Sequence, residues 1–296
     1  MSHEKMKTAK LAKPYRIGDG KHFRIKDFNP ADTGHWHSKE HAQQALAEGV
    51  ARMAELQNKL YAEGSWAVLL IFQGLDAAGK DGAIQHVMSG VNPEGCQVYS
   101  FKSPSAEELQ HDFLWRTTRD LPERGRIGIF NRSYYEEMLV VRVHPEMLQR
   151  ERIPASLVSK NIWEERSEDI RCFERHMARD GTVIRKFFLH LSKKEQKRRF
   201  LARLDEPQKN WKFSVADTHE REHWDDYQKA YEEMIQNTAS KHAPWYVVPA
   251  DNKWFTRLTI SAAIVETLEE LKLSYPKVDA AKRKELAAAR KALEKK

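Results

Sequence analysis

The sequence has no long uninterrupted hydrophobic run, which excludes a membrane-spanning helix. Its basic N-terminal segment lacks the apolar stretch of a secretory signal, so we expect a cytoplasmic protein that does not engage membranes. Two cysteines among 296 residues cannot build a disulfide framework, which fits a reducing compartment. Internal repeats and long glycine- or proline-rich linkers are also missing, and this favours one domain with short extensions.

Positive charge is in excess, because 50 lysines and arginines stand against 43 aspartates and glutamates, for a net charge of +7. This balance favours an anionic partner: a nucleic acid, a membrane surface or a phosphorylated substrate. Composition by itself does not choose among these three classes.

Short apolar segments alternate with helical patterns along most of the chain. Five runs have the length and residue types of buried strands: 66–73, 97–101, 126–131, 182–191 and 245–250. Helices are predicted at about 38–61, 79–90, 105–119, 133–149, 156–180, 192–204, 218–240 and 254–273. Such alternation predicts an α/β fold, in which helices cover both faces of a parallel sheet.

The same patterns divide the chain into three parts. Residues 1–37 form a basic arm without a clear period, which we expect to be irregular. Residues 38–273 hold the α/β domain. Residues 274–296 are rich in alanine, lysine and glutamate and predict an exposed helical tail.

The strongest functional signal directly follows the first predicted strand. The segment GLDAAGKDG has the G-x-x-x-x-G-K spacing of a phosphate-binding loop and opens a helix. Glycines let successive backbone N–H groups point inward, the helix N-terminus adds its positive dipole end, and the lysine places a full charge against the phosphates. An ordinary glycine-rich turn is the competing interpretation. The residues predicted to form the phosphate site are Gly74, Asp76, Ala77, Ala78, Gly79, Lys80, Asp81 and Gly82.

Two acidic residues distinguish this loop from the usual pattern. Asp81 follows Lys80, at the place where a serine or threonine would normally reach Mg²⁺. Asp76 lies inside the loop, where a carboxylate would repel phosphates unless a cation lay between them. We therefore predict that Asp76 binds Mg²⁺, or Mn²⁺ in its place. The alternative is that its side chain only caps the turn.

A second predicted strand ends in Asn131 and Arg132. An acidic metal ligand is usual at this strand end in phosphate-loop proteins, and Asn131 is a weaker ligand in that place. An arginine there can neutralise a phosphoryl group during its transfer. We predict that Asn131 and Arg132 act in catalysis together with Asp76 and Lys80.

Together these segments resemble the polyphosphate kinase 2 family. The resemblance rests on GLDAAGKDG and FNRSYYEE, joined by FKSPS, DFLWR, NWKFS and PADNKW, and it covers about residues 15–273. It implies a thymidylate-kinase-like P-loop kinase fold, a three-layer α/β/α sandwich with a helical lid. It also implies Mg²⁺-dependent phosphoryl transfer between inorganic polyphosphate and nucleotides. Asn131 with Glu136 and Glu137 is most similar to the subgroup that accepts both AMP and ADP.

The resemblance also implies where the substrates bind. The loop would hold the polyphosphate donor, and an adenine nucleotide would lie opposite it as the acceptor. Guanine nucleotides and the reverse reaction stay open, and we expect a homo-oligomer. The residues expected to bind the nucleotide are Lys102, Asp112, Arg116, Arg119, Asp120 and Glu137.

Residues 185–212 are dense in lysine and arginine. Ser192 with Glu195 is a capping box, which predicts a helix start. That helix is expected to direct Lys193, Lys197, Arg198, Arg199 and Arg203 outward. A mobile basic lid is expected at about 204–218, as in P-loop kinases, although a solvated basic face is the competing interpretation. The residues expected to contact polyphosphate are Lys186, Arg199, Arg203, Lys209 and Lys212.

Three other functions fit part of the pattern. An ATP-dependent nucleotide kinase is the nearest rival. A basic P-loop ATPase that binds nucleic acid is disfavoured, because we find no separate recognition module, and so we expect no nucleic-acid partner. A protein that only binds polyphosphate is disfavoured by Asp76 and Lys80. Residues 219–223 match the H-E-x-x-H zinc pattern, but the polar helix around them argues against zinc.

Overall fold

The computed structural model of the chain describes residues 10–294, and within them a six-stranded sheet has the order β1-β6-β5-β2-β4-β3. The strands are β1 (Arg16–Ile17), β2 (Ala67–Gln73), β3 (Cys96–Ser100), β4 (Ile127–Asn131), β5 (Thr182–His190) and β6 (Trp245–Pro249). Strands β2 to β6 run parallel, whereas β1 pairs antiparallel with β6. All seven residues of β2 are buried, as expected for a parallel strand covered on both faces.

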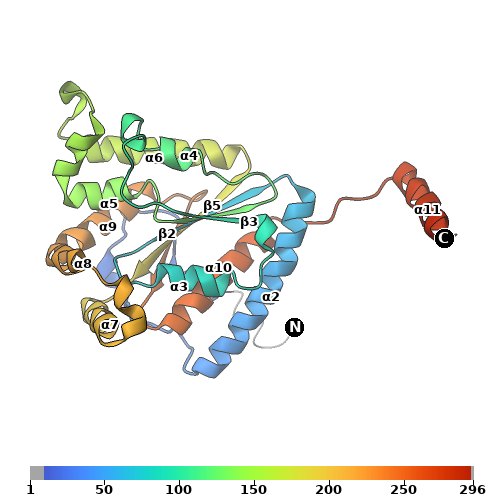
Figure 1. Ribbon diagram of the computed structural model, residues 1–296, viewed down its shortest axis with the longest axis horizontal. Coiled ribbons are helices and arrows are strands. Elements are labelled where there is room, and N and C mark those ends of the chain that lie inside the picture. The colour runs from blue at the N-terminus through green and yellow to red at the C-terminus, as the bar shows by residue number, and fades with distance from the viewer. Residues whose placement is uncertain (1–9, 295–296) are drawn as a thin grey trace.

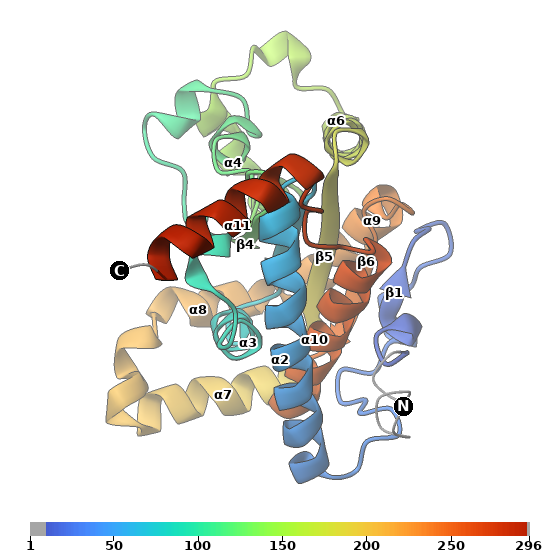
Figure 2. The same cartoon turned by 90° about the vertical axis from the view of Figure 1, so that its right-hand side faces the viewer.

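Helices cover both faces of this sheet (Figure 1). On one face α2 (Lys39–Glu63), α3 (Lys80–Val87) and α10 (Lys253–Glu270) enclose a hydrophobic core. On the other face α5 (Glu136–Val143), α6 (Ile162–Arg179) and α9 (Trp224–Thr238) enclose a second one. The predicted three-layer α/β/α sandwich is therefore confirmed. Figure 2 shows α2 and α10 side by side in front of the sheet.

The remaining helices lie outside these two layers. α7 (Lys193–Asp205) and α8 (Val215–Glu220) lie together beyond one end of the sheet, and the short α4 (Trp115–Thr118) lies on the same side of the sheet as α6 (Figure 1). α11 (Ala280–Glu294) projects away from the body, and all of its described residues are exposed. None of the helices in residues 10–294 combines the length and the apolar character needed to cross a membrane.

One prediction of local structure is wrong. The helix expected at 105–119 is a 3₁₀ turn at Glu108–Gln110 followed by the four-residue α4. Here the side chains of Ser105 and Asp112 accept hydrogen bonds from nearby backbone N–H groups, and such local bonds favour turns over a helix. Of the arm predicted to be irregular at 1–37, residues 1–9 lie outside the described residues, and within 10–37 the chain also contributes β1 to the sheet and buries Tyr15. A two-residue strand is too short to show a period in the sequence.

Three other helices have different limits from those predicted. The helix expected at 156–180 begins only at Ile162, after a 3₁₀ turn at Ala155–Leu157. The one expected at 218–240 is divided, because a 3₁₀ turn at Arg221–His223 separates α8 from α9. The helix expected at 133–149 ends as α5 at Val143, and Pro145 begins a 3₁₀ turn after it.

Candidate active site

The phosphate-binding loop joins the carboxyl end of β2 to the first residue of α3, which is Lys80. Ala77 has φ 64° and Gly79 has φ 101°, both in the left-handed region. For alanine this conformation costs on the order of 1–3 kcal/mol, and it persists where surrounding contacts over-determine it. Such strained positions often occur at active sites, and the strained backbone therefore supports a functional role for this loop.

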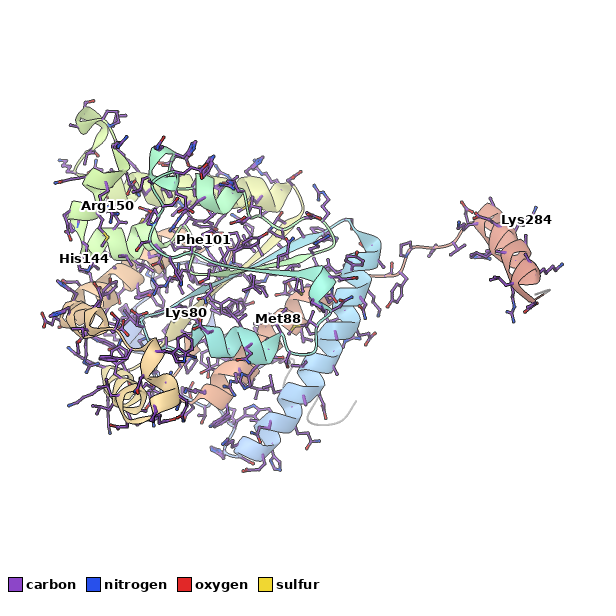
Figure 3. The ribbon with its side chains drawn as sticks, viewed as in Figure 1. Lys80, Met88, Phe101, His144, Arg150 and Lys284 are labelled. Atoms are coloured by element: carbon purple, nitrogen blue, oxygen red, sulfur yellow. The ribbon has the colours of Figure 1, made fainter. Side chains whose placement is uncertain are left out.

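Lys80 lies at the floor of this loop. Its side chain is buried, and its Nζ donates a hydrogen bond to the carbonyl of Gly74. Figure 3 shows Lys80 at the end of α3 that lies nearest α7. Burial lowers the pKa of the Lys80 ammonium, and the nearby charge of Arg132 lowers it further. An anion next to Lys80 would therefore be attracted in a poorly solvated place, where a charge interaction is strong.

Arg132 lies beside the loop because β4 pairs with β2, where Phe72 is opposite Asn131. The N–H of Arg132 donates to the carbonyl of Phe72 over 3.0 Å, and its φ of 66° is again left-handed. Its guanidinium donates to Asp76 Oδ1 over 3.0 Å and to Glu136 Oε2 over 3.5 Å. The charge of Glu136 raises the pKa of Arg132, so the guanidinium stays charged.

Asn131 and Asp81 are also brought together at this strand end. The Nδ2 of Asn131 donates to Asp81 Oδ1 over 2.6 Å. Asn131 therefore directs its amide at the carboxylate that replaces the usual serine or threonine of the loop. The adjacency of β2 and β4 explains why segments 50 residues apart meet here.

The loop opens into a cleft of about 610 Å³ between α3, α7 and the start of α10. Ten cationic side chains line it, against the three carboxylates of Asp76, Asp81 and Glu206. Those named from the sequence as site residues are Lys80, Lys102, Arg132, Arg199, Arg203, Lys209 and Lys212. The excess of positive charge suits a ligand with many negative charges.

A second, smaller pocket of about 110 Å³ lies on the other side of Arg132. Four of the six residues predicted to bind the nucleotide line it: Lys102, Asp112, Arg116 and Glu137. In the part of the chain that the structure describes, Arg119 and Asp120 are not among its lining residues. The Arg119 guanidinium instead stacks over the Trp115 ring, 4.6 Å from its centroid.

Glu137 is held in this pocket by a buried arginine. Arg166 donates to Glu137 Oε2 and to Glu151 Oε2, each over 2.6 Å. Two carboxylates thus share one guanidinium. Burial raises the pKa of Glu137 to about 8, and the charge of Glu151 adds to the rise. The pocket wall therefore combines fixed geometry with a carboxyl group that titrates near neutral pH.

The prediction that Lys186 contacts polyphosphate is wrong. Lys186 lies inside β5 opposite Ile71, and its side chain is fully buried between the sheet and α6. Its Nζ donates to Glu174 over 2.7 Å and to the Tyr135 hydroxyl over 2.8 Å. The sequence around it is dense in cations, but β5 is covered on both faces, so every residue from Ile184 to His190 is buried.

Arg199 is also misplaced by the sequence interpretation, which directs it outward. Only 6% of its surface is exposed, and its guanidinium lies against the loop. The capping box that begins α7 does form, because the N–H of Glu195 donates to Ser192 Oγ over 3.1 Å. Arg199 lies on the inner side of this helix, whereas Arg198 is exposed, and both line the cleft.

Several residues of the site were not assigned to it from the sequence. Arg198, Lys253 and Arg257 line the cleft, and Glu136 contacts Arg132. Lys253 and Arg257 follow the carboxyl end of β6 and are one helical turn apart in α10. Because carboxyl ends of parallel strands meet at one sheet edge, their place after a predicted strand was a usable signal.

The H-E-x-x-H segment forms no single α-helix, because α8 ends at Glu220 and a 3₁₀ turn follows. Glu220 accepts from the Tyr227 hydroxyl over 2.7 Å and lies 3.1 Å from His144 Nε2. These contacts join the end of α8 to α5 and α9. The segment therefore has a structural role at the edge of the region predicted as a lid.

A parallel sheet, a strained phosphate loop with its lysine, and an arginine at the next strand end define a P-loop phosphotransferase. The family model for Polyphosphate kinase 2 (PPK2) matches residues 36–276, and the chain belongs to this family. The family, the P-loop kinase fold and phosphoryl transfer between polyphosphate and nucleotides, all predicted from the sequence, are thereby confirmed.

Individual relatives are similar over nearly their whole length. The chain is 57% identical over 282 residues to the ADP-polyphosphate phosphotransferase of Rhodopseudomonas palustris, covering 92% of this chain and 98% of that one. It is 45% identical over 273 residues to the AMP/ADP-polyphosphate phosphotransferase of Meiothermus ruber, with the same two coverages. The crystal structure of Polyphosphate Kinase 2 from Arthrobacter aurescens superposes with a TM-score of 0.85 at 39% identity, covering 94% and 96% of the two chains.

Proposed function

We propose that this enzyme transfers the terminal phosphoryl group of polyphosphate to both AMP and ADP. The polyphosphate chain binds in the basic cleft, and the nucleotide binds in the smaller pocket. The observation that carries this assignment is the place of Arg132, which lines both cavities. A group moving from one ligand to the other would pass this guanidinium.

The chemistry follows from that arrangement. A terminal phosphate oxygen of the nucleotide attacks the terminal phosphorus of the chain, and the bond to the next phosphate breaks. Polyphosphate leaves one unit shorter, and the nucleotide gains that unit. Lys80 and the loop N–H groups hold the donor phosphates, while Arg132 neutralises charge on the group in transfer. The Asp76 and Glu136 carboxylates orient the Arg132 guanidinium by accepting from its two terminal nitrogens.

Mg²⁺ fits the donor set of the loop. Proteins usually hold Mg²⁺ through one or two carboxylates, with phosphates and waters completing the shell. Asp76 and Asp81 both line the cleft, and residues 10–294 gather no cluster of three or more His, Cys, Asp or Glu that would form a full protein cage. We assign Asp76, with Asp81 beside it, as the residues that hold the ion, which would neutralise phosphate charge there.

Acceptance of both AMP and ADP is supported by Asn131, Glu136 and Glu137, all of which lie at these two cavities. The names of the relatives differ on this point, since one is an ADP-polyphosphate and the other an AMP/ADP-polyphosphate phosphotransferase. The names therefore leave the acceptor open, and an assay has to decide it.

The test is an assay of purified protein with polyphosphate, Mg²⁺ and either AMP or ADP. We expect ADP and then ATP from AMP, and ATP from ADP. Product from ADP alone would contradict the dual acceptor. Phosphorylation of AMP only when ATP replaces polyphosphate would favour the ATP-dependent kinase. GMP and GDP in the same assay test guanine use, and sedimentation of the full chain tests the expected homo-oligomer.

A further inference from the structure

Three consecutive carbonyls of the phosphate loop accept hydrogen bonds from one helix, α7. Gln196 Nε2 donates to the carbonyl of Asp76 over 3.1 Å. Arg199 Nη1 donates to the carbonyls of Ala77 over 2.9 Å and of Ala78 over 3.0 Å. Gln196 and Arg199 are three residues apart and so lie on the same side of α7. The loop is therefore supported from behind along the stretch that contains the left-handed Ala77.

The other bonds of Arg199 tie the loop to the sheet. Its Nη2 donates to the carbonyls of Ala250 over 2.6 Å and of Asp251 over 3.0 Å, just after β6. Its Nε donates to Glu195 over 2.8 Å. A guanidinium has five N–H donors in a planar fork, and these five bonds match that number. Arg199 thus donates all five of its N–H groups to protein oxygens, although it borders a cleft suited to anions.

We propose that Arg199 and Gln196 are positioning residues for phosphoryl transfer, and that Arg199 is not a cation that contacts polyphosphate. By holding the carbonyls of residues 76–78 toward α7, they direct the N–H groups of Ala77 and Gly79 away from that helix and toward the phosphates, whereas the N–H of Ala78 donates to the carbonyl of Leu75. This inference rests on the proposed function, since it concerns the same loop. It reverses the role expected for Arg199 from the basic character of its surroundings.

The physical reason is the cost of the loop conformation. Left-handed Ala77 persists only where contacts over-determine it, and charge-assisted bonds in a buried place are the strong ones. Arg199 supplies two of them to adjacent carbonyls. A lysine cannot replace them, because its donors diverge from one atom and cannot span four carbonyls and a carboxylate. Loss of the fork should let the loop shift enough to misalign the phosphate in transfer, while the unchanged cations of the cleft still bind the rest of the chain.

A further contact joins this support to the lid region. Gln196 Oε1 accepts from Arg221 Nη1 over 2.7 Å, and the same Nη1 donates to the carbonyl of Lys193 over 2.9 Å. Arg221 directly follows α8. Gln196 therefore lies between the loop carbonyl of Asp76 and the end of the lid region.

The test compares Arg199→Lys with two matched variants. Arg185→Lys removes another buried guanidinium, which bonds Thr267 and Glu270 near the far end of α10. Arg198→Ala removes a cation that faces the cleft from the same helix. For Arg199→Lys we expect kcat to fall about tenfold to a hundredfold, the size usual for a misplaced reacting group. Its KM for polyphosphate and the salt dependence of that KM should stay close to those of the wild type.

Each control should behave differently from Arg199→Lys. Arg185→Lys should lower the melting temperature with kcat near the wild-type value. Arg198→Ala should raise the KM for polyphosphate and make its salt dependence shallower. If Arg199→Lys instead raises this KM and flattens its salt dependence at unchanged kcat, Arg199 contacts the donor chain and the proposal is overturned. A loss of kcat no greater than that of Arg185→Lys would equally overturn it.

A second measurement needs no substrate and so does not depend on the proposed function. Amide hydrogen exchange of residues 74–80 should be faster in Arg199→Lys and in Gln196→Met than in the wild type and in Arg198→Ala. Unchanged exchange in both variants would show that α7 does not hold the loop. Failure of the wild type to turn over polyphosphate would instead count against the proposed function, and the exchange result would stand on its own.

Discussion

The cleft and the smaller pocket are neighbours, but they use their charges in opposite ways. In the cleft ten cations face three carboxylates, and Lys212, for example, has an exposed side chain. In the pocket Glu137 and Arg166 are buried, with 7% and 5% of their side chains exposed, and lie 2.6 Å apart. One cavity offers a surplus of accessible charge, and the other offers charges already paired and fixed.

This difference indicates two kinds of recognition. A repeating polyanion needs charge density more than exact geometry, and its binding should weaken as salt rises. A nucleotide has one shape and few charges, so paired and desolvated groups select it through position. Arg132 lines both cavities and combines the two kinds of recognition. Its guanidinium borders the cleft as a positive charge, and ion pairs with Asp76 and Glu136 fix its position.

The largest effect is expected where the two cavities meet the loop, in Lys80→Ala. Loss of a well-placed charge in a poorly solvated site typically costs about 3–4 kcal/mol of barrier, a hundredfold or more in rate. Turnover with either acceptor should therefore be lost, while the melting temperature stays near that of the wild type. Near-normal kcat in this variant would show that the loop takes no part in catalysis.

Arg132→Lys tests whether the shared guanidinium acts on the group in transfer. The change keeps the charge but loses the planar fork, which grips a phosphoryl group at two points. Loss of a charge-assisted hydrogen bond of about 1.5–3 kcal/mol predicts a fall in kcat of about tenfold to a hundredfold. KM values should change less. A rise in the nucleotide KM alone would make Arg132 a binding residue of the pocket.

Asp76→Asn separates metal binding from turn capping on the cleft side. If Asp76 holds Mg²⁺, the variant should need more Mg²⁺ to reach half of a lowered maximal rate, because an amide is a weaker ligand. Asp120→Asn is the matched control, since Asp120 is outside the lining of the pocket. Mg²⁺ titrations of the three proteins give the answer. Identical midpoints for Asp76→Asn and the wild type would leave Asp76 as a turn cap.

The salt dependence of the cleft is tested by replacing Lys209 and Lys212 with alanine. Binding of a polyanion releases counterions, so the slope of log KM for long polyphosphate against log salt should become shallower by about one to two. The nucleotide KM should hardly change. As the control, Lys284 and Lys291 of the exposed α11 are replaced by alanine, which removes the same charge far from the cleft. Equal slopes in the two double variants would show that the lid lysines do not contact polyphosphate and form only a solvated basic face.

The last effect is on stability and not on turnover, and it concerns the pocket and its pH dependence. Burial raises the pKa of Glu137 from 4.5 to about 8, so the folded protein keeps a proton that the unfolded chain loses. The stability due to this carboxyl is therefore present below about pH 4.5 and is lost as the pH rises toward 8. In Glu137→Gln the side chain cannot ionise, so the free energy of unfolding of this variant should not fall as the pH rises. Urea unfolding between about pH 5 and 8 measures it, with exposed Glu94→Gln as a control that should keep the wild-type decline.

Much of this protein was determined by local sequence. β2, the phosphate loop and α3 follow one another along the chain. Each is recognisable from neighbouring residues only: β2 from its continuous apolar run, the loop from its glycines, and α3 from its start after the loop. The strand that ends in Asn131 and Arg132 is recognisable for the same reason. These local segments were enough to predict the family, the three-layer fold and the loop residues from Gly74 to Gly82.

Tertiary structure alone decided which cations serve the ligand and which serve the protein. Lys186, Arg199 and Lys209 lie within one basic stretch, yet Lys186 pairs with Glu174 in the core, Arg199 holds the loop and Lys209 faces the cleft. Composition gives the number of charged residues but not the direction in which each side chain points. That direction depends on the partners that distant segments of the chain bring to each side chain. Glu174, Ala77 and Ala250 lie 12, 122 and 51 residues from the cations that they bind, and only the fold brings them together.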